Sequence, residues 1–105
     1  MSLIAVDGDT VTQEGAHPDG DGNVFGAGTY PITPITLQNF VYINNKLLVV
    51  NGQTYEAHGT ATCIASSSLV YIAGKAVVRD KDYVEHHHAN TGVNCIQQNF
   101  VNDNS

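Results

Sequence analysis

The sequence predicts a small all-β protein with little or no helix. Short runs rich in Val, Ile, Tyr and Phe alternate with Asn, Gly and Asp, a pattern typical of strands and tight turns. No stretch of a dozen residues carries apolar side chains at the i, i+3, i+4, i+7 spacing of an amphipathic helix. A chain of 105 residues fits one domain, so we expect a single unit over residues 1–105.

The strand-like runs predict two β-hairpins of the same design. In the first, Phe40–Ile43 and Leu47–Val50 flank Asn44-Asn45, and Asn tolerates the positive φ that a two-residue turn needs. The second hairpin, Leu69–Val78, turns at Ala73-Gly74.

These hairpins belong to a repeat. Val41-Tyr42-Ile43 recurs as Val70-Tyr71-Ile72, and Gln38-Asn39-Phe40-Val41 recurs as Gln98-Asn99-Phe100-Val101. An isoleucine stands before each copy, and the residue before that isoleucine is Pro34, Cys63 or Cys95. We expect the third copy to be cut short at Ser105. Three copies that cannot bury their own apolar faces predict a compact pseudo-threefold body around one core.

The charge balance excludes several partners. The formal net charge is -6 and only 4 residues are Lys or Arg, so the chain lacks the basic cluster that nucleic acid or an anionic membrane surface requires. Residues 7–33, rich in Asp, Gly and Thr, predict a long loop with little regular structure. The acidic residues near the N-terminus are expected to be solvated: Asp7, Asp9, Glu14, Asp19 and Asp21.

The redox setting favours a metal over a disulfide. Residues 1–6 are too short for the apolar part of a signal peptide and lack a basic lead, so we expect synthesis in a cytoplasm. Structural disulfides are uncommon there. A Cys63–Cys95 disulfide stays as an alternative.

The candidate metal ligands lie in the loops between the repeat units. His17 lies in the Gly-rich N-terminal loop, His58 precedes Cys63, and His86-His87-His88 precede Cys95. Equivalent loops around a threefold axis converge at one end. Imidazole and thiolate suit zinc, and three His with one Cys would form a closed, structural tetrahedron. We expect His17, His58, His88 and Cys95 as ligands and Cys63 as a buried apolar residue, although His86 and His87 stay open as alternatives to His88.

Catalytic constellations are poor in this sequence. It has no nucleophile elbow around Ser66-Ser67-Ser68, no phosphate-binding Gly-rich loop with a following Lys, no HExxH and no CxxC. We therefore expect no enzymatic activity. A small zinc-dependent hydrolase, which would need an open coordination position and a pocket, is one alternative. A metal-free extracellular β-module that binds glycan or protein is another.

The second hairpin carries a resemblance to a known family. Residues 70–82 resemble the repeat of PAAR proteins, which reads roughly V-x-V-N-G-K-P-A-A-R-x-G-D. Ala76 replaces the proline of that repeat and Lys81 replaces the glycine before the final Asp. Gly8-Asp9-Thr10 and His17 are similar to the family's opening G-D-x-T and His. Four positions of the repeat match: Gly74, Lys75, Arg79 and Asp82.

The resemblance implies a structural role. PAAR proteins form a cone that caps the trimeric β-helical spike of contractile tails, in phages and in type VI secretion systems, and they bind zinc near the point through three His and one Cys. It implies a monomeric, membrane-piercing tip at the spike apex of a virion, docked by a flat base on a phage or VgrG-type trimeric spike.

Several details of this role stay open. A bacteriophage tail is favoured and a type VI secretion tip is the alternative, while iron in place of zinc is not excluded by the ligand types. Tyr42 and Tyr71 are candidates for the base, whereas Phe40 and Leu69 are expected in the core.

Overall fold

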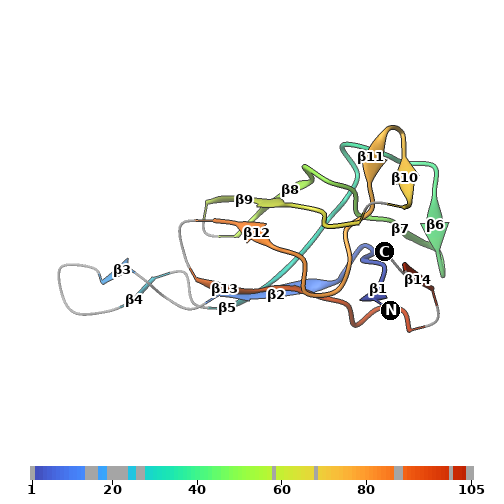
Figure 1. Cartoon of the computed structure of the whole chain (residues 1–105). Helices are drawn as coiled ribbons and strands as arrows, with labels where there is room; N and C mark the ends of the chain where they lie inside the picture. Colours follow the sequence, from blue (N-terminus) through green and yellow to red (C-terminus); the bar gives the residue numbers. More distant parts are fainter. Residues whose placement is uncertain are drawn as a thin grey trace.

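The computed structural model describes residues 2–13, 17–18, 24–25, 28–57, 59–67, 69–86, 89–99 and 101–103. Over these residues the chain forms short strands in small antiparallel sheets and no helix, which confirms the predicted all-β fold class (Figure 1). The described residues therefore include no helix of the length and apolarity needed to cross a membrane.

Two β-hairpins and a third two-stranded sheet gather at one end of the molecule, which we call the hairpin end (Figure 1). Both predicted hairpins are present, and their turn residues have positive φ: 53° at Asn44, 63° at Asn45, 54° at Ala73 and 77° at Gly74. The strands are β6 (Tyr42–Ile43) with β7 (Lys46–Leu47), β10 (Tyr71–Ile72) with β11 (Lys75–Ala76), and β1 (Ser2–Leu3) with β14 (Asn102–Asp103).

The third two-stranded sheet, formed by β1 and β14, corrects an expectation. Its two strands come from opposite ends of the sequence, with Ser2 opposite Asp103 and Leu3 opposite Asn102. The third copy of the repeat is therefore not cut short, because β1 supplies the strand that follows the turn in the other two copies.

Longer strands extend from the hairpin end towards what we call the far end, where β3 and β4 lie (Figure 1). Two three-stranded sheets have the orders β13-β2-β5 and β12-β9-β8. The prediction of a long loop over residues 7–33 is wrong, since β2 and β5 pair in register within it, from Thr10 opposite Pro31 to Gln13 opposite Gly28. The bounds are β2 (Thr10–Gln13), β3 (His17–Pro18), β4 (Val24–Phe25), β5 (Gly28–Pro31), β8 (Thr54–Glu56), β9 (Thr60–Cys63), β12 (Val84–Glu85) and β13 (Asn90–Asn94).

A closed ring of backbone hydrogen bonds joins the three chain segments at the centre. The N–H of Val49 donates to the carbonyl of Ala5 at 3.0 Å, that of Ala5 to Val78 at 2.8 Å, and that of Val78 to Val49 at 2.9 Å. All three residues are fully buried. Each segment thus satisfies its backbone groups with both of the others, which a single isolated hairpin cannot do.

A tight turn follows each ring segment and repeats the same bonds. The N–H of Asp9 donates to Val6 at 3.0 Å, that of Gln53 to Val50 at 3.1 Å, and that of Asp82 to Arg79 at 3.0 Å. The third residue of each turn has positive φ, at 90° in Gly8, 89° in Gly52 and 68° in Lys81. We call these segments, 6–9, 50–53 and 79–82, the three ring turns.

Two hydrophobic clusters hold the fold together. The larger one lies between the ring and the far end and includes Val11, Ile32, Tyr55, Val84 and Val93. The smaller one lies under the hairpins and contains Ile4, Val6, Leu48 and Val77.

Candidate functional site

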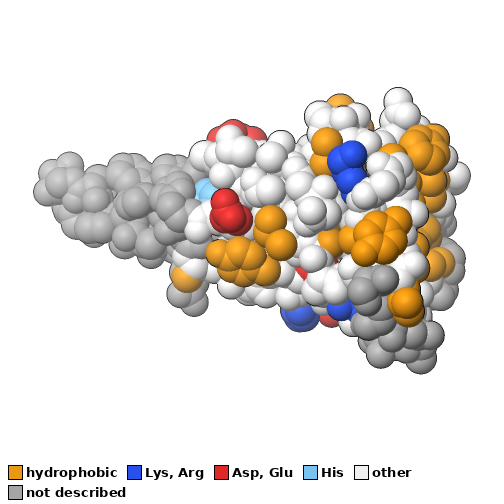
Figure 2. Space-filling view, turned by 45° about the horizontal axis from the view of Figure 1, so that its top comes forward, with side chains coloured by type: hydrophobic (Ala, Val, Ile, Leu, Met, Phe, Trp, Pro, Cys, Tyr) orange, Lys and Arg blue, Asp and Glu red, His pale blue; other side chains and the backbone are white. Residues whose placement is uncertain are grey.

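The hairpin end carries an exposed apolar surface. Phe40 and Leu69 are 62% and 67% exposed, so the expectation that both belong to the core is wrong. Hydrophobic side chains gather on the broad end in the space-filling view (Figure 2). The exposed set in these hairpins and the segments leading into them, which we call the apolar face, is Ile35, Phe40, Tyr42, Leu69, Val70, Tyr71 and Ile96.

Buried glutamines hold the segments that present the apolar face. Gln38 donates its Nε2 to the carbonyls of Val41 and Leu48, at 3.0 and 2.9 Å. Gln98 makes the matching bonds to Val101 and Ile4, at 2.8 and 2.9 Å. The repeated Gln-Asn-Phe-Val sequence therefore encodes a repeated anchor, which fixes the backbone and leaves the side chain of Phe40 outside.

The carboxylate of Asp9 is buried at the centre of the molecule, which corrects the expectation that it is solvated. It is 0% exposed and accepts hydrogen bonds from the backbone N–H groups of Val6 at 2.7 Å, Ile96 at 2.7 Å and Gln97 at 2.9 Å. Asp82 occupies the equivalent place in its own ring turn and accepts from the N–H of Arg79 at 2.8 Å. Both carboxylates are bonded within the protein, so they are structural groups.

The predicted histidine ligands fall mostly outside the described residues. His58 and His88 are not described, and for His17 only the backbone is described, in β3. The strands that precede these histidines in the sequence, β2, β8 and β12, all run from a ring turn towards the far end. The residues that the structure describes contain no group of three or more His, Cys, Asp or Glu side chains that could hold a metal.

Cys95 lies away from these histidine segments. It follows β13 on the side of the hairpin end, with its Sγ 3.6 Å from the carbonyl oxygen of Leu3 and its N–H bonded to Asp80 at 2.9 Å. The length of β13, at about 3.3 Å per residue, separates it from Asn90 at the other end of the strand by roughly 15 Å. Burial raises the pKa of the Cys95 thiol, and the nearby charges of Asp9 and Asp80 raise it further. That it joins the histidines on one ion stays a prediction, because the side chains of His17, His58 and His88 lie outside the described residues.

Cys63 is fully buried in the larger cluster, as a free thiol. Its backbone bonds to Gln53 at 2.8 Å match those of Ile32 to Asp9 at 2.9 Å. The prediction that Cys63 and Cys95 occupy equivalent positions of the repeat is therefore wrong by two residues. The residue equivalent to Cys95 is Ala65. The N–H of Ala65 donates to Asn51 Oδ1 at 2.8 Å, just as the N–H of Cys95 donates to Asp80 Oδ1.

The inner side chains near the far end contain polar atoms without partners. Gln13 is 2% exposed, and neither its Oε1 nor its Nε2 has a hydrogen-bond partner. The hydroxyl of Tyr55, a residue that is 5% exposed, also lacks one. Unpaired buried polar atoms call for an explanation such as a water molecule or an ion. A metal held by the histidine segments fits this observation, since metal-bound imidazoles bring ring N–H groups that need acceptors.

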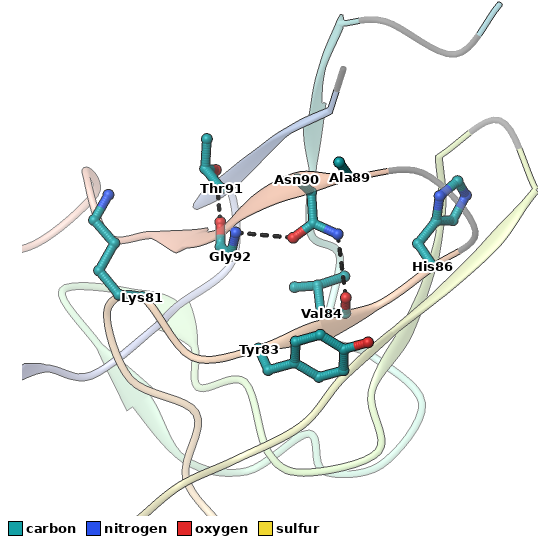
Figure 3. A pocket seen from close by; sticks show the side chains of 8 residues that line it. All are labelled: Lys81, Tyr83, Val84, His86, Ala89, Asn90, Thr91 and Gly92. Atoms are coloured by element: carbon teal, nitrogen blue, oxygen red, sulfur yellow. Dashed lines mark hydrogen bonds between the residues drawn. The ribbon is translucent and has the colours of Figure 1, made fainter. Parts of the chain in front are cut away.

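A hollow of about 570 Å³ opens on the flank between β12 and β13 (Figure 3). The amide of Asn90 spans it, donating to the carbonyl of Val84 at 3.1 Å and accepting from the N–H of Gly92 at 2.8 Å. Tyr83, which is 62% exposed, and His86 lie along its edge. Because β12 and β13 belong to different sheets, the hollow is a gap between the two sheets that the amide of Asn90 bridges.

No arrangement for nucleophilic catalysis forms within the described residues around Ser66. Its hydroxyl donates to Asp82 and accepts from the guanidinium of Arg79. A serine nucleophile needs an adjacent base such as histidine to take its proton. Ser66 is instead bonded to a carboxylate that already holds a ring turn in place.

Comparisons with models of known families, with curated proteins and with solved structures found no significant match.

Proposed function

We propose that this protein is a non-enzymatic tip of the PAAR type. Its hairpin end would cap a trimeric β-helical spike, and a metal near the far end would stiffen the point that enters a target membrane. A bacteriophage tail is the setting we favour, with the tip of a type VI secretion spike as the alternative.

The observation that carries this proposal is the threefold repetition of backbone bonds within a single chain. Ala5, Val49 and Val78 form one closed ring, and each is followed by the same kind of turn. A trimeric spike ends in three equal surfaces. A chain with three similar sectors can meet those surfaces at its base and still converge to one point, as a pseudo-threefold cone.

The position of the PAAR-like residues supports the same reading. The family's glycine before the final Asp corresponds to Lys81, which adopts the left-handed φ of 68° that glycine favours. The first ring turn, Gly8-Asp9, places its carboxylate in the same way as Asp82. The position where the family has glycine thus coincides with a left-handed turn position of this chain, which supports the proposal.

The apolar face supports docking on a protein surface. Contiguous exposed apolar area on a soluble protein marks an interaction site. Aromatic residues are favoured in the centres of interfaces, and Tyr42 and Tyr71 occupy equivalent places in β6 and β10.

The metal part of the proposal rests on the three histidine segments. His17, His58 and His88 follow β2, β8 and β12 in the sequence, three strands that run towards the far end. A structural zinc contributes about 10–16 kcal/mol in small zinc domains, comparable to the whole stability of a domain. Such a cross-link would resist local unfolding when force acts on the point.

A direct test of docking uses the apolar face. We expect the chain to bind as one copy per trimer to the trimeric β-helical fragment of a contractile-tail spike, measured by size-exclusion chromatography with light scattering. The double variant Tyr42→Asp, Tyr71→Asp should lose binding while unfolding at the same denaturant concentration. Glu85→Lys, an exposed change in β12, is the control that should bind normally. Binding to none of a panel of phage and VgrG-type spikes would contradict the proposal.

Metal content tests the second part. We expect one zinc per chain by mass spectrometry, with stability lost on chelation. His58→Ala should lose the zinc and Cys95→Ala should keep it. A protein without metal, unaffected by chelators, would contradict this part, and zinc-dependent ester hydrolysis would favour the hydrolase alternative.

A further inference from the structure

We propose that two of the three sheets at the hairpin end anchor the partner, each through one tyrosine and one lysine, and that the partner's end is an apolar surface edged by carboxylates. This inference rests on the docking proposed above. It adds the chemistry of the partner's surface and the division of the contact among the three sheets.

The three two-stranded sheets at the hairpin end have equivalent positions (Figure 1). One backbone hydrogen bond recurs in them at 3.1 Å, from the N–H of Leu48 to Val41, of Val77 to Val70 and of Ile4 to Val101. The residue directly after each accepting carbonyl therefore occupies the same place in its sheet. These residues are Tyr42, Tyr71 and Asn102, and each pairs across the strands with the residue that precedes the donor.

The third of these equivalent positions differs in its chemistry. Tyr42 and Tyr71 are 55% and 57% exposed, so each presents a phenol ring to a partner. Asn102 is also exposed but presents a short amide, although Ile96, which leads into the third sheet, is an exposed apolar residue. Tyrosine is enriched among the residues that carry most of the binding energy of an interface. Within the described residues of the three sheets, the aromatic anchors therefore belong to two sheets.

A lysine accompanies each of the two tyrosines. Lys46 and Lys75 pair across the strands with the residues that directly follow the tyrosines, and both are partly exposed. In the third sheet Ser2 takes the place of the lysine. The first two sheets thus share a tyrosine and a lysine in the same arrangement, and the third sheet has neither.

The charge of these sheets is opposite to that of the chain as a whole. The chain has 10 Asp or Glu residues against 4 Lys or Arg residues and a formal net charge of -6. Within the described residues of the three sheets, the one carboxylate, Asp103, is 2% exposed and accepts a hydrogen bond from the hydroxyl of Ser67. Lys46 and Lys75 give this end its positive charge. Because complementary charges steer association and fix its register, a matching partner carries carboxylates opposite the two lysines.

The repetition of the tyrosine and lysine favours a trimeric protein over a lipid surface. A homotrimer repeats every apolar patch and every carboxylate around its axis. The two tyrosine-bearing sheets also repeat around one axis, because the buried ring of Ala5, Val49 and Val78 holds their segments in equivalent settings. A fluid anionic bilayer would attract tyrosines and lysines at any spacing, so it gives no reason for this repetition.

The first test removes the charge of the two lysines. It uses the full-length chain and a trimeric spike fragment that binds the wild type, with the affinity measured by isothermal titration calorimetry at low and high salt. The double variant Lys46→Gln, Lys75→Gln should bind about tenfold more weakly at low salt, and the difference should shrink at high salt because salt screens the charges. Lys81→Gln, which removes an exposed charge from the third ring turn, is the matched control and should bind normally. Equal affinity of the double variant and the wild type at low salt would overturn the carboxylate-edged surface.

The second test gives the third sheet the anchor that it lacks. Asn102→Tyr places an aromatic ring at the equivalent position and should bind about tenfold more tightly than the wild type. Asn102→Ala should bind like the wild type. Lost binding in Asn102→Ala would show that the amide is itself an anchor and would overturn the division of the contact, as would unchanged or weaker binding in Asn102→Tyr.

Two further results distinguish a failure of this inference from a failure of the docking itself. Spike binding that depends on Tyr42 and Tyr71 but is unaffected by the changes at Lys46, Lys75 and Asn102 would overturn the inference alone. The wild type should not bind vesicles of phosphatidylcholine with phosphatidylserine. Lysine-dependent binding to these vesicles, with no binding to any spike of the panel, would overturn the inference and the docking together.

Discussion

The ring turns are followed, in the same three chain segments, by the inner positions Gln13, Ala57 and His86, which make up the far-end layer. The ring turns and the far-end layer satisfy their buried polar groups differently. In the ring turns, Asp9 accepts three backbone N–H bonds and Asp82 accepts two. In the far-end layer, the amide of Gln13 is buried with no partner. The difference is one of degree, because Gln53 Oε1 in the second ring turn is also buried without a partner, whereas at Gln13 both amide atoms are.

This difference indicates where stability and where function are concentrated. Backbone bonds that close on themselves around three segments give a rigid base without any ligand. A buried amide that lacks a partner is a cost that a folded protein tolerates where something binds. Changes in the ring should hence lower stability whatever the metal content, and changes in the far-end layer should act through the metal that we propose there.

The largest effect is expected from removing the carboxylate of Asp9. In Asp9→Ala three backbone N–H groups, those of Val6, Ile96 and Gln97, lose their acceptor in the protein interior. We expect a loss of about 3–5 kcal/mol in the free energy of unfolding, measured by urea denaturation followed by circular dichroism.

Asp9→Asn is the control for this change, because it keeps one acceptor oxygen and nearly the same volume. It should lose less than half as much. If Asp9→Ala lost under 1 kcal/mol, the ring would not depend on this carboxylate and the contrast with the far-end layer would fail.

A smaller effect is expected from the thiol of Cys63, which bonds through its backbone to the second ring turn. Burial, and to a lesser extent the charge of Asp82, raises the pKa of Cys63 from 9.0 to about 12. The unfolded chain therefore loses this proton near pH 9 while the folded protein retains it. The thiol's contribution is fully present below pH 9 and is lost as the pH rises towards 12, by up to about 1.4 kcal/mol per pH unit.

Cys63→Val provides the comparison, since the equivalent residues Ile32 and Val93 are apolar and fully buried. Denaturant unfolding from pH 8 to pH 11 should show a shallower fall in stability for Cys63→Val than for the wild type. Parallel curves would show that Cys63 is ionised at the same pH in both states.

Local sequence signals predicted the hairpin end better than the rest of the fold. Asn44-Asn45 and Ala73-Gly74 marked their turns because few residues adopt positive φ easily. β2 was missed because it is only four residues long and lies in a Gly- and Asp-rich segment, although Thr10–Gln13 does alternate outward and inward. Its pairing with β5 and β13 depends on contacts that no local pattern records.

The exposure of Phe40 and Leu69 and the unpartnered state of the Gln13 amide could not be predicted, for related reasons. Apolar character alone does not tell a core residue from one on an interaction surface. An orphaned amide becomes visible only when burial and hydrogen bonds are known together. For Cys95, the sequence suggested a common ligand set with the histidines, and this stays a prediction, since the side chains of His17, His58 and His88 are not described.

The smallest effect is expected at Lys81, where the third ring turn departs from the first two. Its φ of 68° is left-handed, as it is in Gly8 and Gly52, and a side chain in this conformation costs about 1–2 kcal/mol. Lys81→Gly removes this cost but adds backbone freedom to the unfolded chain and loses the exposed bond from Lys81 Nζ to Asn94 Oδ1. We expect a net gain of about 0.5–1 kcal/mol in urea denaturation.

Two further variants decide whether backbone strain is the cause of that gain. Lys81→Ala keeps the strain and loses the bond to Asn94, so it should be no more stable than the wild type. Gly52→Ala introduces the strain where an added Cβ would meet only Leu37, at 3.7 Å, so its loss of about 1 kcal/mol would come from φ alone. A Lys81→Gly protein less stable than Lys81→Ala would mean that the third turn does not share the geometry of the other two, and the equivalence of the three ring turns would have to be abandoned.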